Sequence, residues 1–270
     1  MDKKYKFTVL GCRGSASVCE KTHMEYGGDT SSFMLCTEDK TIIFDSGSGI
    51  LKSSDLLTET EECHLLLSHM HMDHIIGLAF WRPLFQKEKC VHIYSEKRNM
   101  MTAKQQISNF LKAPYWPVGV ELFNGVKEYR DIVIGESFKI GDTDVKTMRS
   151  NHPDDCTLYR VEWEGKSVVY ALDFEHSEKS TAELADFARD CDLLVYDATY
   201  TPEEYPEKMG WGHSTWEEGL KLKKKANAKQ LLLAHLDIRQ SDEMLDSLQK
   251  KLTETDDKVY LAKEGMEIWI

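Results

Sequence analysis

Residues 68–74 restrict the possible fold and function of this chain more than any other segment. Three histidines and one aspartate lie within residues 69–74. They follow residues 63–67, a short apolar run that predicts a buried strand. In extended chain, His69 and His71 point to the same side, whereas the last two residues lie where the following apolar run begins a helix. Zinc and its first-row neighbours accept His and Asp as ligands. The segment therefore predicts a metal site, with two diverging pairs of ligands suited to two neighbouring ions.

Three later segments share one feature, because each predicted strand leads directly to a side chain that can bind a metal. These side chains are His152 after residues 145–149, Asp173 after residues 167–172, and His235 after residues 230–234. Taken singly, the two histidines would be ordinary loop residues. In layered α/β proteins, however, strand ends that meet at one sheet edge build a site from distant segments. We therefore expect these side chains to join the first segment.

The motif His-x-His-x-Asp-His resembles the signature of the metallo-β-lactamase superfamily. That resemblance implies an α/β fold with four layers, αββα, and two divalent metal ions, with zinc or manganese expected and iron left open. It also implies the ligands of each ion. By resemblance, His69, His71 and His152 hold one ion, Asp73, His74 and His235 hold the other, and Asp173 bridges them.

The order of predicted elements agrees with such a sandwich in one domain over residues 1–270. Strands are expected near residues 7–10, 32–36, 41–44, 64–67, 91–94, 138–140, 145–148, 158–163, 168–172, 193–196 and 230–234. Helices are expected near residues 50–57, 181–189, 215–226 and 242–252. An insertion is expected near residues 97–123, helical at first and then an aromatic loop with prolines. It either packs against the sandwich, forms a wall of a substrate cleft, or contacts another subunit.

Residues 192–215 resemble the phosphodiesterase branch of the superfamily, which includes the tRNA 3′-processing endonuclease RNase Z and the cyclic-phosphate phosphodiesterases. In that branch, an acidic residue before Ala-Thr orients a later histidine in a His-x-Thr motif. Asp197 and His213 match these positions, although the endonuclease has glutamate where this chain has aspartate. Residues 11–15, 26–31 and 114–118 are similar to a bacterial group of cyclic-nucleotide-phosphodiesterase-like hydrolases.

The resemblance implies a dinuclear metal-dependent hydrolase that cleaves a small or cyclic phosphodiester through a hydroxide bridging the metals. Such a reaction also needs a proton for the departing alkoxide. The expected catalytic residues are Asp73, His213 and Asp197, with His213 as the proton donor and Asp197 orienting it. Another interpretation of His213 is structural, since Ser214 or Thr215 is a typical start of a helix.

Three alternative functions stay open from the sequence. A tRNA 3′-processing endonuclease would share all of these motifs, but no long basic, glycine-rich arm for gripping tRNA is evident. A thioester or lactone hydrolase would share the metal ligands without needing Asp197 and His213. A non-catalytic carrier protein in coenzyme assembly would not need the full ligand set.

Composition restricts the partners. A chain of 270 residues with 41% hydrophobic content can bury a large core. The net charge of −12 argues against stable nucleic-acid binding, because phosphate backbones are held mainly by Lys and Arg.

Seven cysteines without C-x-x-C spacing indicate reduced thiols in a cytoplasmic protein. The apolar run near the N-terminus is too short for a signal peptide and predicts a strand. No membrane partner is expected, and a homodimer is left open.

Several smaller expectations complete the sequence analysis. The glycine turns at residues 26–32 and 44–49 lack the context of nucleotide loops, so we expect them to bring backbone close to the metals. Asp45 either accepts a hydrogen bond from a ligand imidazole or is a plain turn residue. His176 lies in the cleft or in solvent. Three further histidines lack ligand spacing and are predicted to be structural: His23, His64 and His92.

Overall fold

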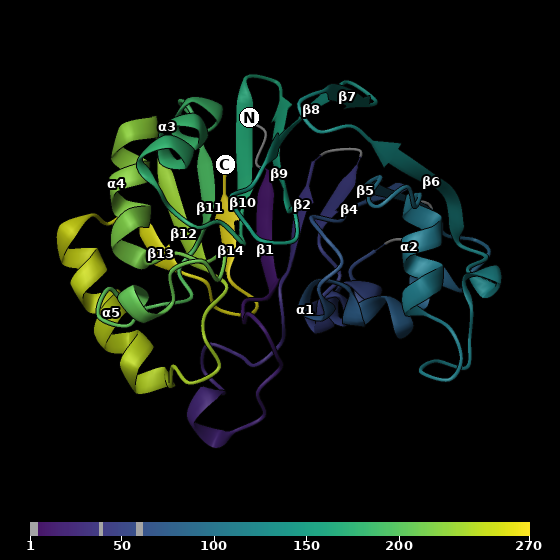
Figure 1. The fold of residues 1–270 in the computed structure, drawn as a ribbon, viewed down its shortest axis with the longest axis horizontal. Helices are drawn as coiled ribbons and strands as arrows, with labels where there is room; N and C mark the ends of the chain where they lie inside the picture. The colour runs from purple at the N-terminus through teal and green to yellow at the C-terminus, as the bar shows by residue number, and fades with distance from the viewer. Residues whose placement is uncertain (1–4, 38–39, 58–61) are drawn as a thin grey trace.

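Two stacked β-sheets form the centre of the molecule, and helices cover the outer face of each (Figure 1). The computed structural model describes residues 5–37, 40–57 and 62–270. The predicted αββα fold is confirmed by this layering. One hydrophobic cluster fills the space between the sheets and continues under the helices of the second sheet, and a smaller one lies under the helices of the first.

The first sheet has seven strands in the order β14-β1-β2-β3-β4-β5-β6. From β3 to β6 the strands are parallel, so their carboxyl ends meet at one edge. The strands are β1 (Lys6–Gly11), β2 (Ser32–Cys36), β3 (Thr41–Phe44), β4 (Glu62–Leu66), β5 (Cys90–Glu96), β6 (Val126–Ile132) and β14 (Glu267–Trp269).

The second sheet repeats this plan in the order β13-β12-β11-β10-β9-β8-β7 and is parallel from β10 to β13. Every residue of β11 is buried, as expected of a parallel strand covered on both faces. The strands are β7 (Ser137–Ile140), β8 (Thr143–Arg149), β9 (Thr157–Trp163), β10 (Lys166–Ala171), β11 (Leu193–Asp197), β12 (Gln230–Ala234) and β13 (Val259–Leu261).

Helices α1 and α2 belong to the side of the first sheet, and α3, α4 and α5 to the side of the second (Figure 1). Hydroxyl side chains cap the last three, at Ser177, Thr215 and Ser241. The α-helices are α1 (Met72–Ile75), α2 (Ala103–Phe110), α3 (Glu178–Phe187), α4 (Trp216–Ala226) and α5 (Asp242–Thr255). Short 3₁₀ helices are η1 (Lys21–His23), η2 (Ser48–Asp55), η3 (Ile76–Ala79), η4 (Arg82–Leu84), η5 (Val120–Leu122) and η6 (Tyr205–Glu207).

Two predicted helices take a different form. The α-helix expected at residues 50–57 is the 3₁₀ helix η2, because the Ser53 hydroxyl donates to the Ile50 carbonyl that an α-helix would offer to a later N–H. The helix expected after residue 73 changes to a 3₁₀ turn after four residues. There the Gly77 N–H donates to the Ser46 carbonyl at 2.8 Å and is lost to the α-helical ladder.

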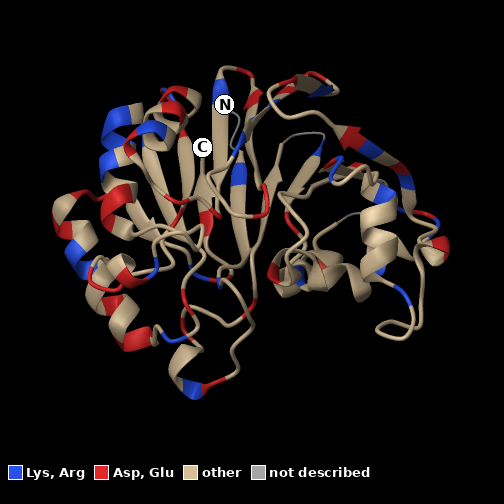
Figure 2. Ribbon diagram, viewed as in Figure 1, with Lys and Arg blue, Asp and Glu red and all other residues tan. Residues whose placement is uncertain are grey.

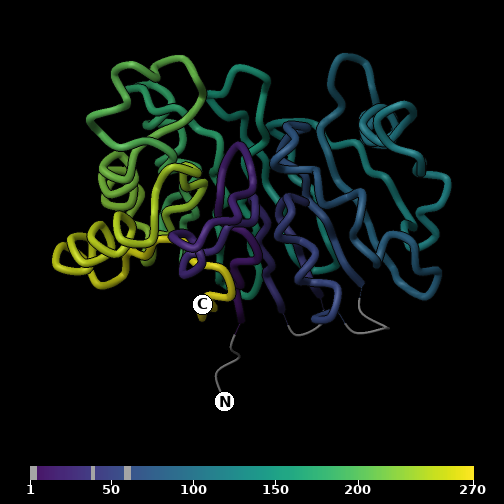
Figure 3. The backbone as a smooth tube through the Cα atoms, turned by 90° about the horizontal axis from the view of Figure 1, so that it is seen from below, coloured from purple at the N-terminus to yellow at the C-terminus, as the bar shows by residue number. Residues whose placement is uncertain are grey.

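Three strands were not predicted. The edge strand β6 carries mostly charged side chains and buries only Ile132 fully, so it lacks an apolar run. The strands β13 and β14 have three residues each, too few for a periodic pattern. Figure 3 shows the C-terminal segment beside the N-terminal one, where β14 pairs with β1 and closes the edge of the first sheet.

The segment at residues 97–123 forms α2, η5 and the loop between them. Helix α2 packs against β5 and β6, and Ile107 and Leu111 are buried in the smaller hydrophobic cluster. The segment is therefore packed against the outer face of the first sheet.

Charged residues are mixed over the surface elements. Figure 2 shows Lys and Arg interspersed with Asp and Glu on the outer helices α3, α4 and α5. No helix in the described residues is both long enough and apolar enough to cross a bilayer.

Candidate metal centre

The candidate site lies where the carboxyl ends of parallel strands meet between the two sheets. His69 follows β4, Asp173 follows β10 and His235 follows β12. Asp173 and His235 have positive φ angles of 52° and 60°, a region that residues other than glycine rarely occupy. These sharp turns at the strand ends are the kind of backbone strain that gathers at functional sites.

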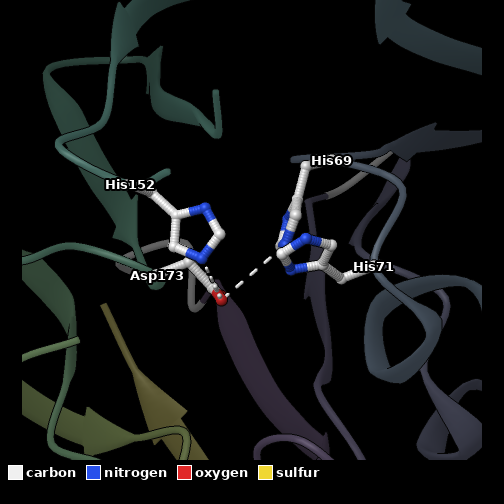
Figure 4. Close-up of side chains that lie close together, drawn as sticks. All are labelled: His69, His71, His152 and Asp173. Carbon is white, nitrogen blue, oxygen red and sulfur yellow. Dashed lines mark ion pairs between the residues drawn. The ribbon is translucent and has the colours of Figure 1, made fainter. Parts of the chain in front are cut away.

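One cluster comprises His69, His71, His152 and Asp173, whose ligand atoms all lie within 4.8 Å of one another (Figure 4). In Figure 4 the first two histidines face His152, and the Asp173 carboxylate lies below the space between them. Its Oδ1 atom is 3.7 Å from Nε2 of His69 and 3.7 Å from Nε2 of His152.

A second cluster comprises Asp73, His74 and His235, again within 4.8 Å of one another. Here the other carboxylate oxygen of Asp173, Oδ2, is 3.0 Å from Nε2 of His74 and 3.6 Å from Nε2 of His235. The two oxygens of one carboxylate thus face two different clusters. This is the arrangement that a bridging ligand requires.

The donor set suits divalent metal ions. His69 and Asp173 are almost fully buried, and Nε2 of His69 has no hydrogen-bond partner among the described residues. A buried imidazole nitrogen without a partner costs free energy unless a metal or donor occupies the space beside it. Nitrogen and oxygen donors in this number fit zinc, manganese or iron.

The pKa shifts in the two clusters also indicate that the buried carboxylates are stabilised by positive charge. Burial alone would raise the pKa of Asp173, but the imidazoles of His235, His74 and His69 hold it well below its usual range. Burial would lower the pKa of His74, but the carboxylates of Asp173, Asp73 and Asp45 raise it well above its usual value. In the metal-free protein, protons thus supply the charge that metal ions would supply, so metal binding should release protons.

Asp45 supports the site from behind. Its Oδ2 atom accepts hydrogen bonds from Nδ1 of His74, the Ser68 hydroxyl and the Tyr170 hydroxyl, each at 2.7 Å. Of the two interpretations of Asp45, the structure favours the one in which its carboxylate accepts a hydrogen bond from the imidazole of a candidate ligand, here His74. Such a contact fixes the tautomer and direction of the ring, so that Nε2 faces Asp73 and Asp173.

We expect Asp45→Asn to weaken metal binding by about 10- to 100-fold, because the amide no longer holds the His74 imidazole as a carboxylate does. Metal affinity measured by competition with a chromophoric chelator tests this. Tyr170→Phe is the matched control, since it removes one hydrogen bond to Asp45 and leaves the bond to His74 in place. Equal affinities of wild type and Asp45→Asn would contradict the supporting role.

Asp197 and His213 form a pair beside the clusters. Nδ1 of His213 donates to Oδ2 of Asp197 at 2.9 Å, and the imidazole stacks on that of His235 with centroids 4.8 Å apart. Oδ1 of Asp197 also accepts the backbone N–H groups of Thr199 and Ser214. The fully buried Asp197 therefore fixes both the ring of His213 and the loop that carries it.

The turn that carries His213 also has the structural role predicted for it, as the start of a helix. Thr215 is the N-cap of α4, and its hydroxyl accepts from the N–H of Glu218. His213 immediately precedes this cap but keeps its side chain beside Asp197. Ligand atoms of Asp173, His213 and His235 also lie within 4.8 Å of one another, so His213 is close enough to be a ligand itself. The metal content of a His213 variant distinguishes a ligand from a proton donor.

Glu175, which holds the loop before His213, was not predicted from the sequence. Its carboxylate accepts the N–H of Gly210 at 2.6 Å and that of Gly212 at 2.9 Å. Gly212 has φ of 87°, and a Cβ there would come within 2.3 Å of Cδ2 of His152. The one available signal was the position of Glu175, two residues after Asp173.

Two more expectations can be compared with the structure. In the turn at residues 44–49, a Cβ on Gly47 would lie 2.4 Å from the carbonyl oxygen of Asp73, so this turn does bring backbone close to the site. His176 is partly buried behind His213, where its Nδ1 lies 2.8 Å from the Ser214 hydroxyl. It belongs to neither cluster.

A pocket of about 270 Å³ opens beside the first cluster. It lies between the His69–His71 segment and the start of the 97–123 segment, so α2 forms one of its walls. Polar side chains predominate in the lining, which consists of His69, Met70, His71, Arg98, Asn99, Met101, Gln106, Asn109 and Asp154.

Comparison with known proteins agrees with this geometry. The family described as Beta-lactamase superfamily domain matches residues 20–236. Ribonuclease Z of Haloarcula marismortui is 24% identical over 312 residues, covering 97% of this chain and 96% of that protein. The metallo-β-lactamase fold protein YhfI from Bacillus subtilis has a TM-score of 0.76 at 19% identity, covering 100% of both chains.

A further solved structure, a diphosphatase from the PhnP family, has a TM-score of 0.72 at 19% identity. It covers 99% of this chain and 97% of that one. The family match extends over most of the chain and includes all seven predicted ligands and His213. The chain therefore belongs to the metallo-β-lactamase superfamily and is a metal-dependent hydrolase.

Proposed function

We propose that this protein is a dinuclear phosphodiesterase that acts on a small or cyclic phosphodiester. The observation that carries the proposal is the hydrogen bond of 2.9 Å between His213 and Asp197, beside two clusters of metal-binding side chains. A lactone or thioester hydrolase, or a carrier protein, would have no use for this pair. The proposed metals are two zinc or manganese ions, with iron as a further option.

The proposed roles follow from the donor atoms. His69, His71 and His152 would hold one ion, Asp73, His74 and His235 the other, and Asp173 both. The ions would supply an activated hydroxide and neutralise charge on the phosphoryl oxygens. The chain itself supplies the proton. Because Nδ1 of His213 donates to Asp197, the Nε2 of a protonated ring is left to donate to the departing alkoxide.

The pocket supports a small substrate. Its volume of about 270 Å³ is just below the usual range of ligand sites, about 300–1,000 Å³, which suits one nucleotide-sized group better than a folded RNA. Arg98 is held in place by the Ser68 carbonyl at 2.7 Å and by Glu96, so its charge is partly balanced before any substrate binds. Three amide side chains, Asn99, Gln106 and Asn109, also line the pocket. Because the Gln106 amide already donates to the Glu96 and Met101 carbonyls, Asn99 and Asn109 would contact the substrate.

The second candidate function is tRNA 3′-end processing, favoured by the full-length similarity to ribonuclease Z. The net charge of −12 and the mixed surface charges weigh against it. Cleavage of a precursor tRNA at a rate exceeding that for small diesters would establish it. For the location we propose the cytoplasm, on the ground that all seven cysteines are free thiols.

We expect the metal-loaded protein to hydrolyse bis(p-nitrophenyl) phosphate or a cyclic nucleotide faster than lactones or β-lactams. The physical reason is that two neighbouring metal ions would neutralise the charge of a phosphoryl group. For a cyclic nucleotide, whose leaving group is an alkoxide, His213 is in addition placed to donate the proton. Initial rates with a panel of these substrates, at equal protein and metal concentrations, test the proposal. Efficient turnover of a lactone without detectable diester cleavage would assign the chain a different chemistry.

A further inference from the structure

A second group of metal-binding side chains lies at the start of strands β4 and β5. These strands are parallel neighbours, and their register pairs Glu62 with Cys90 and His64 with His92. Residues two apart in a strand point to the same face. The four side chains therefore form a two-by-two set on one face of the first sheet.

Three of the four donor atoms, those of Glu62, Cys90 and His92, lie within 4.8 Å of one another. Nε2 of His92 is 2.8 Å from Oε1 of Glu62 and 3.4 Å from Sγ of Cys90. Nε2 of His64 is 3.9 Å from the same Glu62 oxygen. In a tetrahedral zinc site with bonds of about 2.0–2.3 Å, ligand atoms are about 3.3–3.6 Å apart. The separations from His92 to Glu62 and Cys90 bracket this value. The His64 imidazole would have to turn toward these three side chains to complete the set.

His64 supplies an independent observation. Its side chain is buried, at 4% exposure, and Nε2 has no hydrogen-bond partner among the described residues. Nδ1 lies 3.0 Å from the Tyr94 hydroxyl, so Nε2 is the only ring nitrogen left, and it faces Glu62. A buried imidazole nitrogen without a partner is a candidate metal ligand.

The surroundings of His92 also resemble those of a metal ligand. Its second ring nitrogen, Nδ1, is 3.3 Å from the Glu128 carboxylate on β6. A carboxylate behind a ligand histidine fixes the ring and strengthens its donor nitrogen. The Glu62 side chain is 48% exposed, so an ion has access from solvent.

We propose that Glu62, His64, Cys90 and His92 bind one zinc-type divalent ion, at a site separate from the hydrolytic centre. One thiolate, two imidazoles and one carboxylate are a set that zinc accepts and that calcium or magnesium does not favour. His69 follows the opposite end of β4, at roughly 15–25 Å along the chain. The ion would link the first residues of β4 and β5. The opposite end of β4 leads to His69 in the hydrolytic centre.

Titration of the metal-free protein with Co²⁺ tests this proposal, because a cobalt–thiolate bond gives a charge-transfer band in the near ultraviolet. The residues proposed for the hydrolytic centre offer only nitrogen and oxygen, so the band reports on a cysteine ligand. We expect the band in wild type, saturating at about one ion per chain. Cys90→Ser should abolish it, whereas Cys19→Ser, which changes an exposed cysteine, should leave it unchanged.

Two further variants make the result decisive. Glu128→Gln should weaken Co²⁺ binding at this site by about 10- to 100-fold, and His92→Gln, which removes a ligand, by more. Circular dichroism and diester hydrolysis verify that each variant is folded and that its hydrolytic centre is intact. The proposal is overturned if wild type saturated with Co²⁺ shows no such band, or if the band persists in folded Cys90→Ser and His92→Gln proteins.

Discussion

Asp173→Ala should deplete both metal sites and lower diester hydrolysis by about 10³-fold or more. The reason is that the two oxygens of this carboxylate face different clusters, Oδ1 toward His69 and His152 and Oδ2 toward His74 and His235. Removing the carboxylate takes away the group that both clusters share and leaves the first cluster with imidazoles alone. Elemental analysis after metal loading, together with initial rates, measures both effects.

His152→Ala is the matched comparison, because His152 belongs to one cluster only. The substitution should chiefly weaken the binding of one ion. The metal content should therefore fall by about one ion per chain while the other site stays occupied. Circular dichroism must show that both variants are folded. Wild type that contains a single fully occupied site after careful metal supplementation would defeat the dinuclear assignment.

His213→Ala should lower turnover by about 10²- to 10⁴-fold for substrates with poor leaving groups, with metal content nearly unchanged. The loss should shrink for p-nitrophenyl esters, because p-nitrophenolate leaves without much help from a proton. Asp197→Asn should give a milder defect of the same kind, since the hydrogen bond from Nδ1 of His213 is weakened or misdirected. Turnover over a series of leaving groups of graded pKa measures the dependence.

His176→Ala is the control, because His176 contacts Ser214 from behind and belongs to neither cluster. Its turnover should show no added dependence on the leaving group. Equal losses across all leaving groups in His213→Ala would refute the general-acid role. Loss of a metal ion would instead make His213 a ligand, which its position near Asp173 and His235 permits.

The positions of most strands along the chain, and the ends of several of them, were predictable from the sequence for a simple physical reason. Parallel strands covered on both faces must be apolar throughout, so runs such as those of β10, β11 and β12 are distinct in the chain. Polar residues at their ends then mark the edge where a site can form. Where burial is one-sided, as in β6, or a strand is very short, as in β14, that signal is absent.

The sequence by itself thus determined the fold class, the strands that lead to His69, Asp173 and His235, and the candidate ligands. Tertiary structure decided which oxygen of Asp173 faces which cluster, and that Glu175 holds the loop before His213. It also paired Glu62 with Cys90 and His64 with His92. Strand register joins residues far apart in the chain, and no periodic pattern within one segment records that register.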